Sequence, residues 1–444
     1  MSEKRSSGAP TPPATVAPET GWSRRSLLKG AAASAGVAAG SGALGGFPTI
    51  WAQNLKDITL LQVGGSYSAI IDIGRKASED LGFKVEMQNA AHDALLNRLV
   101  TQPESLDIAD VEYFFLMYLI PRGNVIQPVD LSKYQWWEQV VPIFTKGEYP
   151  DGRKVSDQGI LPYEVQYVEG PGATAFAAGP TGFATAIPSV YNADTLGIRP
   201  DLLGREIDSW AEILNPEFAG KTALVDVPSI GIMDAAMAIE ARGDIKYADK
   251  GNMTQDEIDQ TIQILIDAKK AGQFRAFWTT FDESVNLMAS GEVILQSMWS
   301  PAVTAVRSRG IPCYYVPLKE GYRAWASCMA PMAHLEGLKL EAAYEYLNWY
   351  QSGWQGAFIA KQGYYTSVPE TAKEHMSEND WNYWYEGQPA AEEIKDPYGN
   401  HMEDQGHVRD GGAFWERMGH VACWNTLMDE NRYMIRKWNE FIAS

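Results

Sequence analysis

The hydrophobic pattern after residue 53 changes its period every few residues, which is typical of strands that alternate with helices. An apolar run at 58–63 predicts a strand, and Gly64-Gly65-Ser66 follows it directly. Residues 67–80 have helical spacing, and Gly82 marks the end of that helix. Its apolar face carries Ile70, Ile71, Gly74 and Ala77. The alternation at 83–87 predicts a second strand, so this region indicates a βαβ start with parallel strands.

The same alternation continues farther along the chain. A helix is predicted over 91–101, and the apolar segment 107–111 predicts the next strand. The clearest helix is 254–271, where Thr254 and Glu257 fit a capping box and an apolar stripe follows. Alternating strands and helices favour an α/β fold. Two core-sized halves favour two α/β lobes with a ligand between them, because ligands of open α/β sheets bind outside the carboxyl ends of the strands.

We expect the chain to cross between the two lobes more than once. We predict that the first lobe comprises residues 54–178 and 326–370. The second lobe would then comprise residues 179–325 and 371–444. Turn-rich segments on either side of residue 165 are consistent with the first crossover between the lobes.

Residues 1–53 are predicted to be an export signal. Adjacent arginines lie within Ser23–Lys29, and a weakly hydrophobic run rich in Ala and Gly follows at 30–46. A twin-arginine signal has this order of features, and the run is short for a membrane span. We expect cleavage near Ala52 or Gln53 and a periplasmic mature protein that folds before export.

Composition excludes several classes of function. The chain has 444 residues, is 45% hydrophobic and carries a formal net charge of −19. Such a surface repels phosphate backbones, so no nucleic-acid partner is expected. The three cysteines and six histidines form no CxxC or HExxH motif, so no metal site is expected. The glycine patterns of serine hydrolases, dinucleotide-binding folds and P-loops are absent, so the sequence indicates neither an enzyme nor a cofactor.

Cys313 and Cys328 lie on either side of the turn at 319–321. They could form a disulfide in the oxidising periplasm, or remain two buried thiols. Folding before export favours the thiols.

A block at 209–221, with the sequence SWAEILNPEFAGK, closely resembles a signature of the spermidine/putrescine-type periplasmic binding proteins of ABC importers. Other landmarks of that family follow in order along nearly all of the mature chain. They are Gly64-Gly65-Ser66-Tyr67, Gly182-Phe183-Ala184-Thr185, Tyr191-Asn192, Gly291-Glu292-Val293, Met298-Trp299, Pro317-Leu318-Lys319-Glu320-Gly321, Trp325 and Gly363-Tyr364-Tyr365-Thr366. The resemblance implies the two-lobed type II fold, which closes around its ligand by a hinge. It also implies a monomer that delivers a small organic solute to the membrane subunits of an ABC permease.

The resemblance also implies where the solute binds. Trp299, Trp325 and Tyr364 match an aromatic box that holds methylene chains and cationic nitrogens by cation–π contact. The alternative is that these rings belong to the core. Ser66 and Tyr67 follow the first strand, where the family has an aromatic residue.

Two departures concern the carboxylates that pair with an ammonium group in polyamine binders. Ser327 stands where those proteins have Asp, and after the strand that follows the 209–221 block only Asp226 remains acidic. Because burying an unpaired ammonium costs several kcal/mol, a polyamine-like solute would need substitutes such as Glu112, Asp282 or Glu283. The predicted ligand-binding residues are therefore Ser66, Tyr67, Glu112, Asp226, Trp299, Trp325, Ser327 and Tyr364.

Other solutes stay open at this point. Gly64-Gly65-Ser66 at a helix start, with Arg275, Arg307 and Arg323, would suit a carboxylate or a zwitterion with a quaternary amine. The adjacent Tyr364-Tyr365 would suit ferric iron if a histidine and a carboxylate lay nearby. A twin-arginine-exported enzyme is the remaining alternative.

Overall fold

The computed structural model describes residues 55–444, so the predicted export signal lies outside the described residues. The strands are β1 (Thr59–Gly64), β2 (Lys84–Asn89), β3 (Ile108–Glu112), β4 (Val129–Asp130), β5 (Tyr167–Val168), β6 (Phe183–Ala184), β7 (Ile187–Ile198), β8 (Thr222–Val225), β9 (Phe274–Trp278), β10 (Leu295–Met298), β11 (Tyr314–Tyr315), β12 (Tyr322–Pro331), β13 (Tyr365–Thr366), β14 (Ile394–Lys395), β15 (His401–Glu403) and β16 (Val421–Trp424). The α-helices are α3 (Ile71–Leu81), α4 (His92–Thr101), α5 (Leu116–Leu119), α6 (Pro142–Thr145), α7 (Pro200–Leu203), α8 (Pro228–Arg242), α9 (Gln255–Lys270), α10 (Phe281–Ser290), α11 (Ser300–Arg307), α12 (Gly337–Tyr350), α13 (Trp354–Ala360), α14 (Pro369–Lys373), α15 (Glu378–Trp384), α16 (Phe414–Met418) and α17 (Asn431–Ala443). None of these helices combines the length and the hydrophobicity of a membrane span.

One long sheet has the strand order β2-β1-β3-β12-β7-β10-β8-β9. At one end β1 pairs in parallel with β2 and β3, which confirms the predicted βαβ start. At the other end β8 pairs in parallel with β9 and β10. Between these two parallel groups lie β12 and β7, which are antiparallel to each other and to the adjoining strands β3 and β10.

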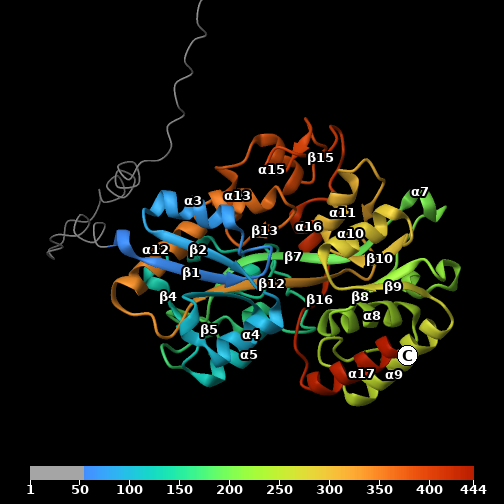
Figure 1. Ribbon diagram of the computed structural model, residues 1–444, viewed down its shortest axis with the longest axis horizontal. Coiled ribbons are helices and arrows are strands. Elements are labelled where there is room, and N and C mark those ends of the chain that lie inside the picture. The colour runs from blue at the N-terminus through green and yellow to red at the C-terminus, as the bar shows by residue number, and fades with distance from the viewer. Residues whose placement is uncertain (1–54) are drawn as a thin grey trace, which may run out of the picture. The chain divides into compact units, whose positions relative to one another are not determined.

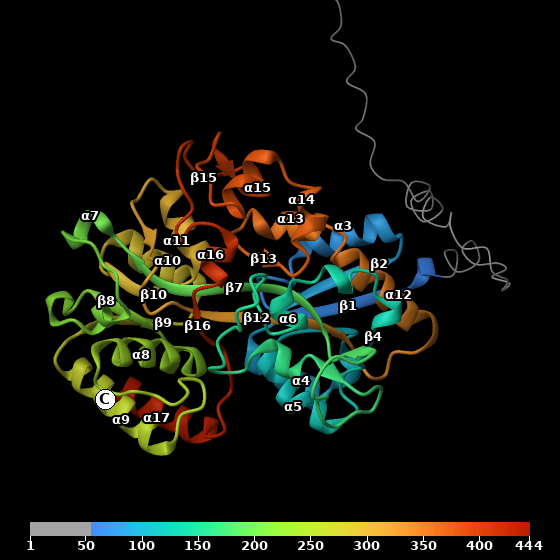
Figure 2. The same cartoon turned by 180° about the vertical axis from the view of Figure 1, so that it is seen from behind.

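The strands β7 and β12 lie between the two parallel groups and run through the middle of the sheet (Figures 1 and 2). Every residue of β7 and of β12 is buried. Strand β7 pairs with β12 over its first part and with β10 over Thr195–Ile198. The two groups of parallel strands are therefore joined through continuous, fully buried strands.

Two hydrophobic cores pack against the sheet, and the first of them reaches both of its ends. The first surrounds β1, β3 and α12 and extends to α10 and α11. The second lies among β8, α8, α9 and α17 and contains Trp210, Leu265 and Trp438. The C-terminal segment contributes to both cores, with Trp384 and Phe414 in the first and Met434 and Trp438 in the second.

Local signals predicted most elements but misplaced the start of one helix. Thr254 and Glu257 form the expected capping box at the start of α9. The helix expected from residue 67 begins at Ile71, because the carbonyl of Gly65 accepts hydrogen bonds from the N–H groups of Ser68 and Ala69 in a turn. Ile71 was expected on the buried face and is instead 77% exposed. Within the 209–221 block the chain forms two 3-10 turns, Trp210–Leu214 and Pro216–Phe218.

The cysteines Cys313, Cys328 and Cys423 are all free and buried. Burial raises the pKa of Cys313 and of Cys423 to about 12, and it also raises the pKa of Cys328 well above its ordinary value. The alternative of two buried thiols at Cys313 and Cys328 is therefore the one that the structure contains.

Candidate functional site

Three aromatic rings meet beside the carboxyl end of β1. The centroid of the Tyr67 ring lies 4.7 Å from that of Trp325 and 6.3 Å from that of Tyr364. The rings of Trp325 and Tyr364 are 6.0 Å apart and nearly perpendicular. Tyr67 comes from the turn after β1, Trp325 from β12, and Tyr364 from the residue before β13. Sequence-distant segments thus place three predicted residues in one cluster.

Two further predicted residues, Glu112 and Ser327, face this cluster. Tyr67 and Ser327 share a hydrogen bond of 2.8 Å between their hydroxyl oxygens. Ser327 lies opposite Glu112 in the β3–β12 register. Burial first, and then the nearby carboxylates of Glu112 and Asp110, raise the pKa of Tyr67 well above its ordinary value. The phenol therefore remains a neutral hydrogen-bonding group at physiological pH.

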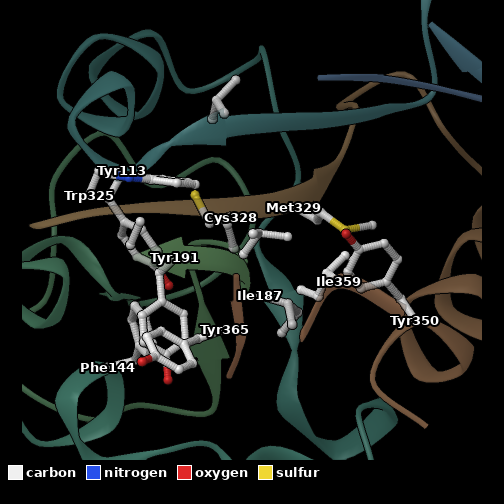
Figure 3. Packing of buried hydrophobic residues seen from close by; sticks show 14 of the residues in the cluster. Tyr113, Phe144, Ile187, Tyr191, Trp325, Cys328, Met329, Tyr350, Ile359 and Tyr365 are labelled. Carbon is white, nitrogen blue, oxygen red and sulfur yellow. The ribbon is translucent and has the colours of Figure 1, made fainter. Parts of the chain in front are cut away.

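A small cavity, too narrow to admit a water molecule, adjoins the cluster. It is lined by Glu112, Tyr113, Phe114, Ile160, Pro162, Trp325, Ala326, Trp424 and Asn425. Glu112 is only 3% exposed and Trp325 only 7% exposed. Figure 3 shows Trp325 close to Tyr113 beside β12. A carboxylate and a large π surface therefore line the same narrow space, and groups of these two kinds hold organic cations.

Three separate segments of the chain pack against one another beside this cavity. The N–H of Trp424 donates to the carbonyl of Gln158 at 2.8 Å, and the N–H of Gly159 donates to Asp249 Oδ1 at 2.9 Å. Gly159 has φ 84°, and a Cβ there would overlap the carbonyl oxygen of Trp424. Only glycine allows this approach of the backbones, so the loop around Gly159 is docked against the C-terminal segment and the 249–251 loop.

A buried ionic network lies behind the cavity. Arg323, on β12, donates from Nε to Asp234 Oδ1 at 2.6 Å and from Nη2 to Asp194 Oδ2 at 3.3 Å. Asp194 belongs to β7 and Asp234 to α8. Arg323 is 2% exposed, so these ion pairs are shielded from water and connect both long strands to a helix of the second core.

Asp110 lies on β3, two residues before Glu112. Among the described residues, no cationic side chain donates a hydrogen bond to its carboxylate. Its carboxylate accepts from Ser189 Oγ at 3.0 Å and from Gln62 Nε2 at 3.2 Å. Complete burial raises the pKa of Asp110 to about 7, although hydrogen bonds from Ser68 and Ser189 oppose the rise.

The other three predicted binding residues have different surroundings. Trp299 is half-buried, and its ring contacts Trp278 edge-on at 4.8 Å. Asp226 Oδ1 accepts a hydrogen bond of 2.7 Å from the indole N–H of Trp438, which fastens α17 to the end of β8. Ser66 is exposed in the turn after β1. The cluster thus consists of Tyr67, Glu112, Trp325, Ser327 and Tyr364.

The features expected to favour an anion have other roles. The Gly64-Gly65-Ser66 turn is separated from the first residue of α3, so it does not form a helix N-terminus. Arg275 pairs with Glu292, and Arg307 pairs with Glu403 and Asp410. Since Arg323 also pairs with carboxylates, each of these arginines already has an anionic partner within the chain.

The structure also shows the surroundings of Glu283, a candidate substitute carboxylate, and of Tyr364 and Tyr365, the candidate iron ligands. Glu283 caps its own helix by accepting from the N–H groups of Thr279 and Thr280. The Tyr365 ring is grouped with Tyr191 and Phe414, whereas Tyr364 joins the Trp325 cluster. Figure 3 shows the same grouping of Tyr365 with Tyr191. Within the described chain, no group of three or more His, Cys, Asp or Glu side chains could hold a metal ion.

A larger depression of about 520 Å³ lies at the surface between residues 147–161 and the pair Gly419 and Val421. Its cations are paired, Arg153 with Asp151 and Lys154 with Glu148. It therefore lacks the combination of a buried carboxylate and aromatic faces that the smaller cavity has.

The comparison with known families decides the class of the protein. Residues 74–384 match the family described as bacterial extracellular solute-binding protein. The chain belongs to this family. Its members bind solutes, so the site described above is the candidate solute site.

Solved structures show the same fold at low sequence identity. The spermidine/putrescine ABC transporter substrate-binding protein of Streptococcus pneumoniae has 14% identity and a TM-score of 0.57, with 87% of this chain and 97% of that chain covered. The Atu4243 GABA receptor has 16% identity and a TM-score of 0.53, with coverage of 87% and 97%. The binding protein AgtB of A. tumefaciens R10, in complex with agropinic acid, has 15% identity and a TM-score of 0.50, with coverage of 87% and 99%. This solute-binding protein therefore has the two-lobed α/β fold predicted from its sequence.

Proposed function

We propose that this protein is the substrate-binding component of an ABC importer and binds a small, polyamine-like organic solute that carries an ammonium group. The observation that supports this most is the contact of Tyr67, Trp325 and Tyr364 beside the buried carboxylate of Glu112. A carboxylate supplies the charge that an ammonium needs in a buried site, and the rings hold its methylene chain. The family and the fold of a spermidine/putrescine-binding protein agree with this assignment.

A carboxylate-bearing solute is the second candidate. It is favoured by the similar fold of the agropinic acid complex. The pairing of Arg275, Arg307 and Arg323 with acids of the same chain argues against it, because a solute carboxylate would have to compete for them.

Solute entry requires the lobes to separate. The cavity is too narrow to admit a water molecule, whereas pockets that enclose small ligands have volumes of roughly 300–1,000 Å³. The continuous strands β7 and β12 are the connections about which a hinge motion would occur. We expect the lobe boundaries to fall within these strands and near β16, and the solute to favour the closed state because it contacts both lobes.

The remaining parts of the proposal concern the cellular setting. The twin-arginine segment within 1–53 supports export of the folded protein to the periplasm. There it would act as a monomer that presents its solute to the membrane subunits of the permease, without catalysis.

Thermal unfolding of the mature protein against a solute panel tests the proposed class. The panel contains putrescine, spermidine, choline, betaine, amino acids, opine-like acids and ferric citrate. A ligand present at 100 times its Kd stabilises the folded state by about 2.7 kcal/mol, which raises the unfolding temperature measurably. Stabilisation by the di- and triamines is expected. A response to carboxylates alone would contradict the amine class while leaving the family assignment intact.

Trp325→Leu should weaken the binding of a stabilising amine by about tenfold to a hundredfold. The substitution removes the π surface beside Glu112 and keeps much of the volume, so we expect about 1–3 kcal/mol of lost binding free energy. Isothermal titration calorimetry on the folded variant measures the change. Trp299→Leu is the matched control, because the Trp299 ring contacts Trp278 rather than the cluster. Equal losses in both variants would contradict the assignment of Trp325 to the site.

A further inference from the structure

Asn425 lies between the carboxylate of the cavity and the ion pairs of the long strands. Its Nδ2 donates to Glu112 Oε2 at 2.9 Å. Its Oδ1 accepts from Arg323 Nη1 at 2.7 Å. The backbone N–H of Asn425 donates to the carbonyl of Ala324 at 2.8 Å, which fixes the residue against β12. Glu112, Arg323 and Asn425 are all buried.

The two partners determine the orientation of the Asn425 amide. A guanidinium group has only donors, so the amide oxygen must face Arg323. An ionised carboxylate has only acceptors, so the NH₂ group must face Glu112. Aspartate at this position would present an oxygen to Glu112, and an apolar side chain would satisfy neither partner. Asparagine therefore matches both sides with one short side chain.

The contacts of Asn425 form part of a chain of hydrogen bonds between the two cores. Asp234 on α8 binds Arg323, Arg323 binds Asn425, and Asn425 binds Glu112 at the end of β3. Asn425 itself follows β16, in the C-terminal segment. The C-terminal segment thus supplies a side chain to the solute cavity and to the hinge strands at once.

We propose that Asn425 is a positioning residue that gives the site its preference for solutes with an ammonium group. It holds one oxygen of Glu112 in a fixed place beside Trp325 and links that carboxylate to Arg323. This inference rests on the proposed function, because it assigns Glu112 to an ammonium. The C-terminal segment then contributes a side chain to the binding site, in addition to packing against one lobe.

Asn425→Ala removes the amide and keeps the backbone hydrogen bond to Ala324. With putrescine as the probe, the affinity at pH 7.5 should fall about tenfold. Calorimetry of the wild type and the variant measures the change.

Two further variants separate positioning from a general effect on folding. In a Glu112→Gln background, Asn425→Ala should cause little additional loss of putrescine affinity, because the two residues act through the same carboxylate. Asn252→Ala is the matched control: this amide also fastens the C-terminal segment, through both atoms, to Asp429. It should lower the unfolding temperature without changing the affinity for putrescine.

The outcomes distinguish the two proposals. If the wild type binds putrescine and Asn425→Ala leaves the affinity unchanged, the role of Asn425 is overturned and the proposed function stands. If the wild type binds no amine, the amine class and the role of Asn425 are both overturned. Should Asn425→Ala fail to fold, Asn425→Ser, whose hydroxyl is one atom short of the amide, is expected to show a smaller loss in the same direction.

Discussion

Arg323→Met is expected to lower the free energy of unfolding by about 3–5 kcal/mol. The guanidinium group is 2% exposed and pairs with Asp194 and Asp234, which are equally inaccessible to water. Removing one partner of a buried ion pair leaves uncompensated charge in a medium of low polarity, and that costs several kcal/mol. Here two carboxylates would be left without their counterion. Urea unfolding at pH 7.5, followed by tryptophan fluorescence, measures the change.

The matched control is Arg153→Met, which removes an exposed arginine paired with Asp151 at 2.7 Å. Exposed pairs contribute about 0–1 kcal/mol, so this variant should unfold near the wild type. Adding Asp194→Asn and Asp234→Asn to Arg323→Met should recover part of the lost stability, because these two buried carboxylates would no longer lack a counterion. A loss below about 1 kcal/mol for Arg323→Met alone would mean that the ion pairs contribute little.

Asp110→Asn should abolish a pH dependence of stability that the wild type shows between about pH 4 and pH 7. The folded protein keeps the Asp110 proton up to a pKa of about 7, whereas the unfolded chain releases it near the ordinary value of 3.8. The unfolded state therefore binds fewer protons over this interval, and the wild type loses stability as the pH rises through it. A difference of about three between the pKa values of Asp110 in the folded and unfolded states corresponds to roughly 4 kcal/mol in the free energy of unfolding. This contribution is fully lost above pH 7.

Denaturant unfolding of the wild type and Asp110→Asn at pH 4.5, 6 and 8 measures this difference. The stability of the variant relative to the wild type should rise with pH and then level off. The amide keeps an oxygen toward Gln62 and places its NH₂ toward the hydroxyl of Ser189, which can accept. Asp404→Asn, at a side chain 92% exposed, is the control and should follow the wild type. Parallel curves for wild type and Asp110→Asn would show that Asp110 is ionised in the fold.

The elements of the fold were predictable where the signal is local. The first strands and the α9 capping box depend on residues a few positions apart, and these predictions were confirmed. The predicted start of α3 was wrong because the carbonyl of Gly65 accepts hydrogen bonds from two N–H groups in a turn. Hydrophobic periodicity does not reveal such a turn. Ile71 is exposed for the same reason.

The site was predictable in part. The order of family landmarks pointed to Tyr67, Trp325 and Tyr364, and the structure brings these rings together. Asn425 was not predicted, because it meets Glu112 across 313 positions of sequence and no periodic pattern marks it. Asp226 lies at a strand end, as expected, but the last helix provides Trp438 as its partner. Such partners depend on where the C-terminal segment packs, which local patterns do not encode.

The three buried thiols leave the native surface without a reactive sulfur nucleophile. Their raised pKa values keep them in the thiol form, which alkylating reagents attack slowly. A cysteine introduced at exposed Ile71 beside the first core, or at exposed Leu202 on α7, would then be the fast-reacting site for a maleimide dye. A donor and an acceptor fluorophore at these two positions would convert the proposed opening motion into an optical signal, without first removing any native cysteine.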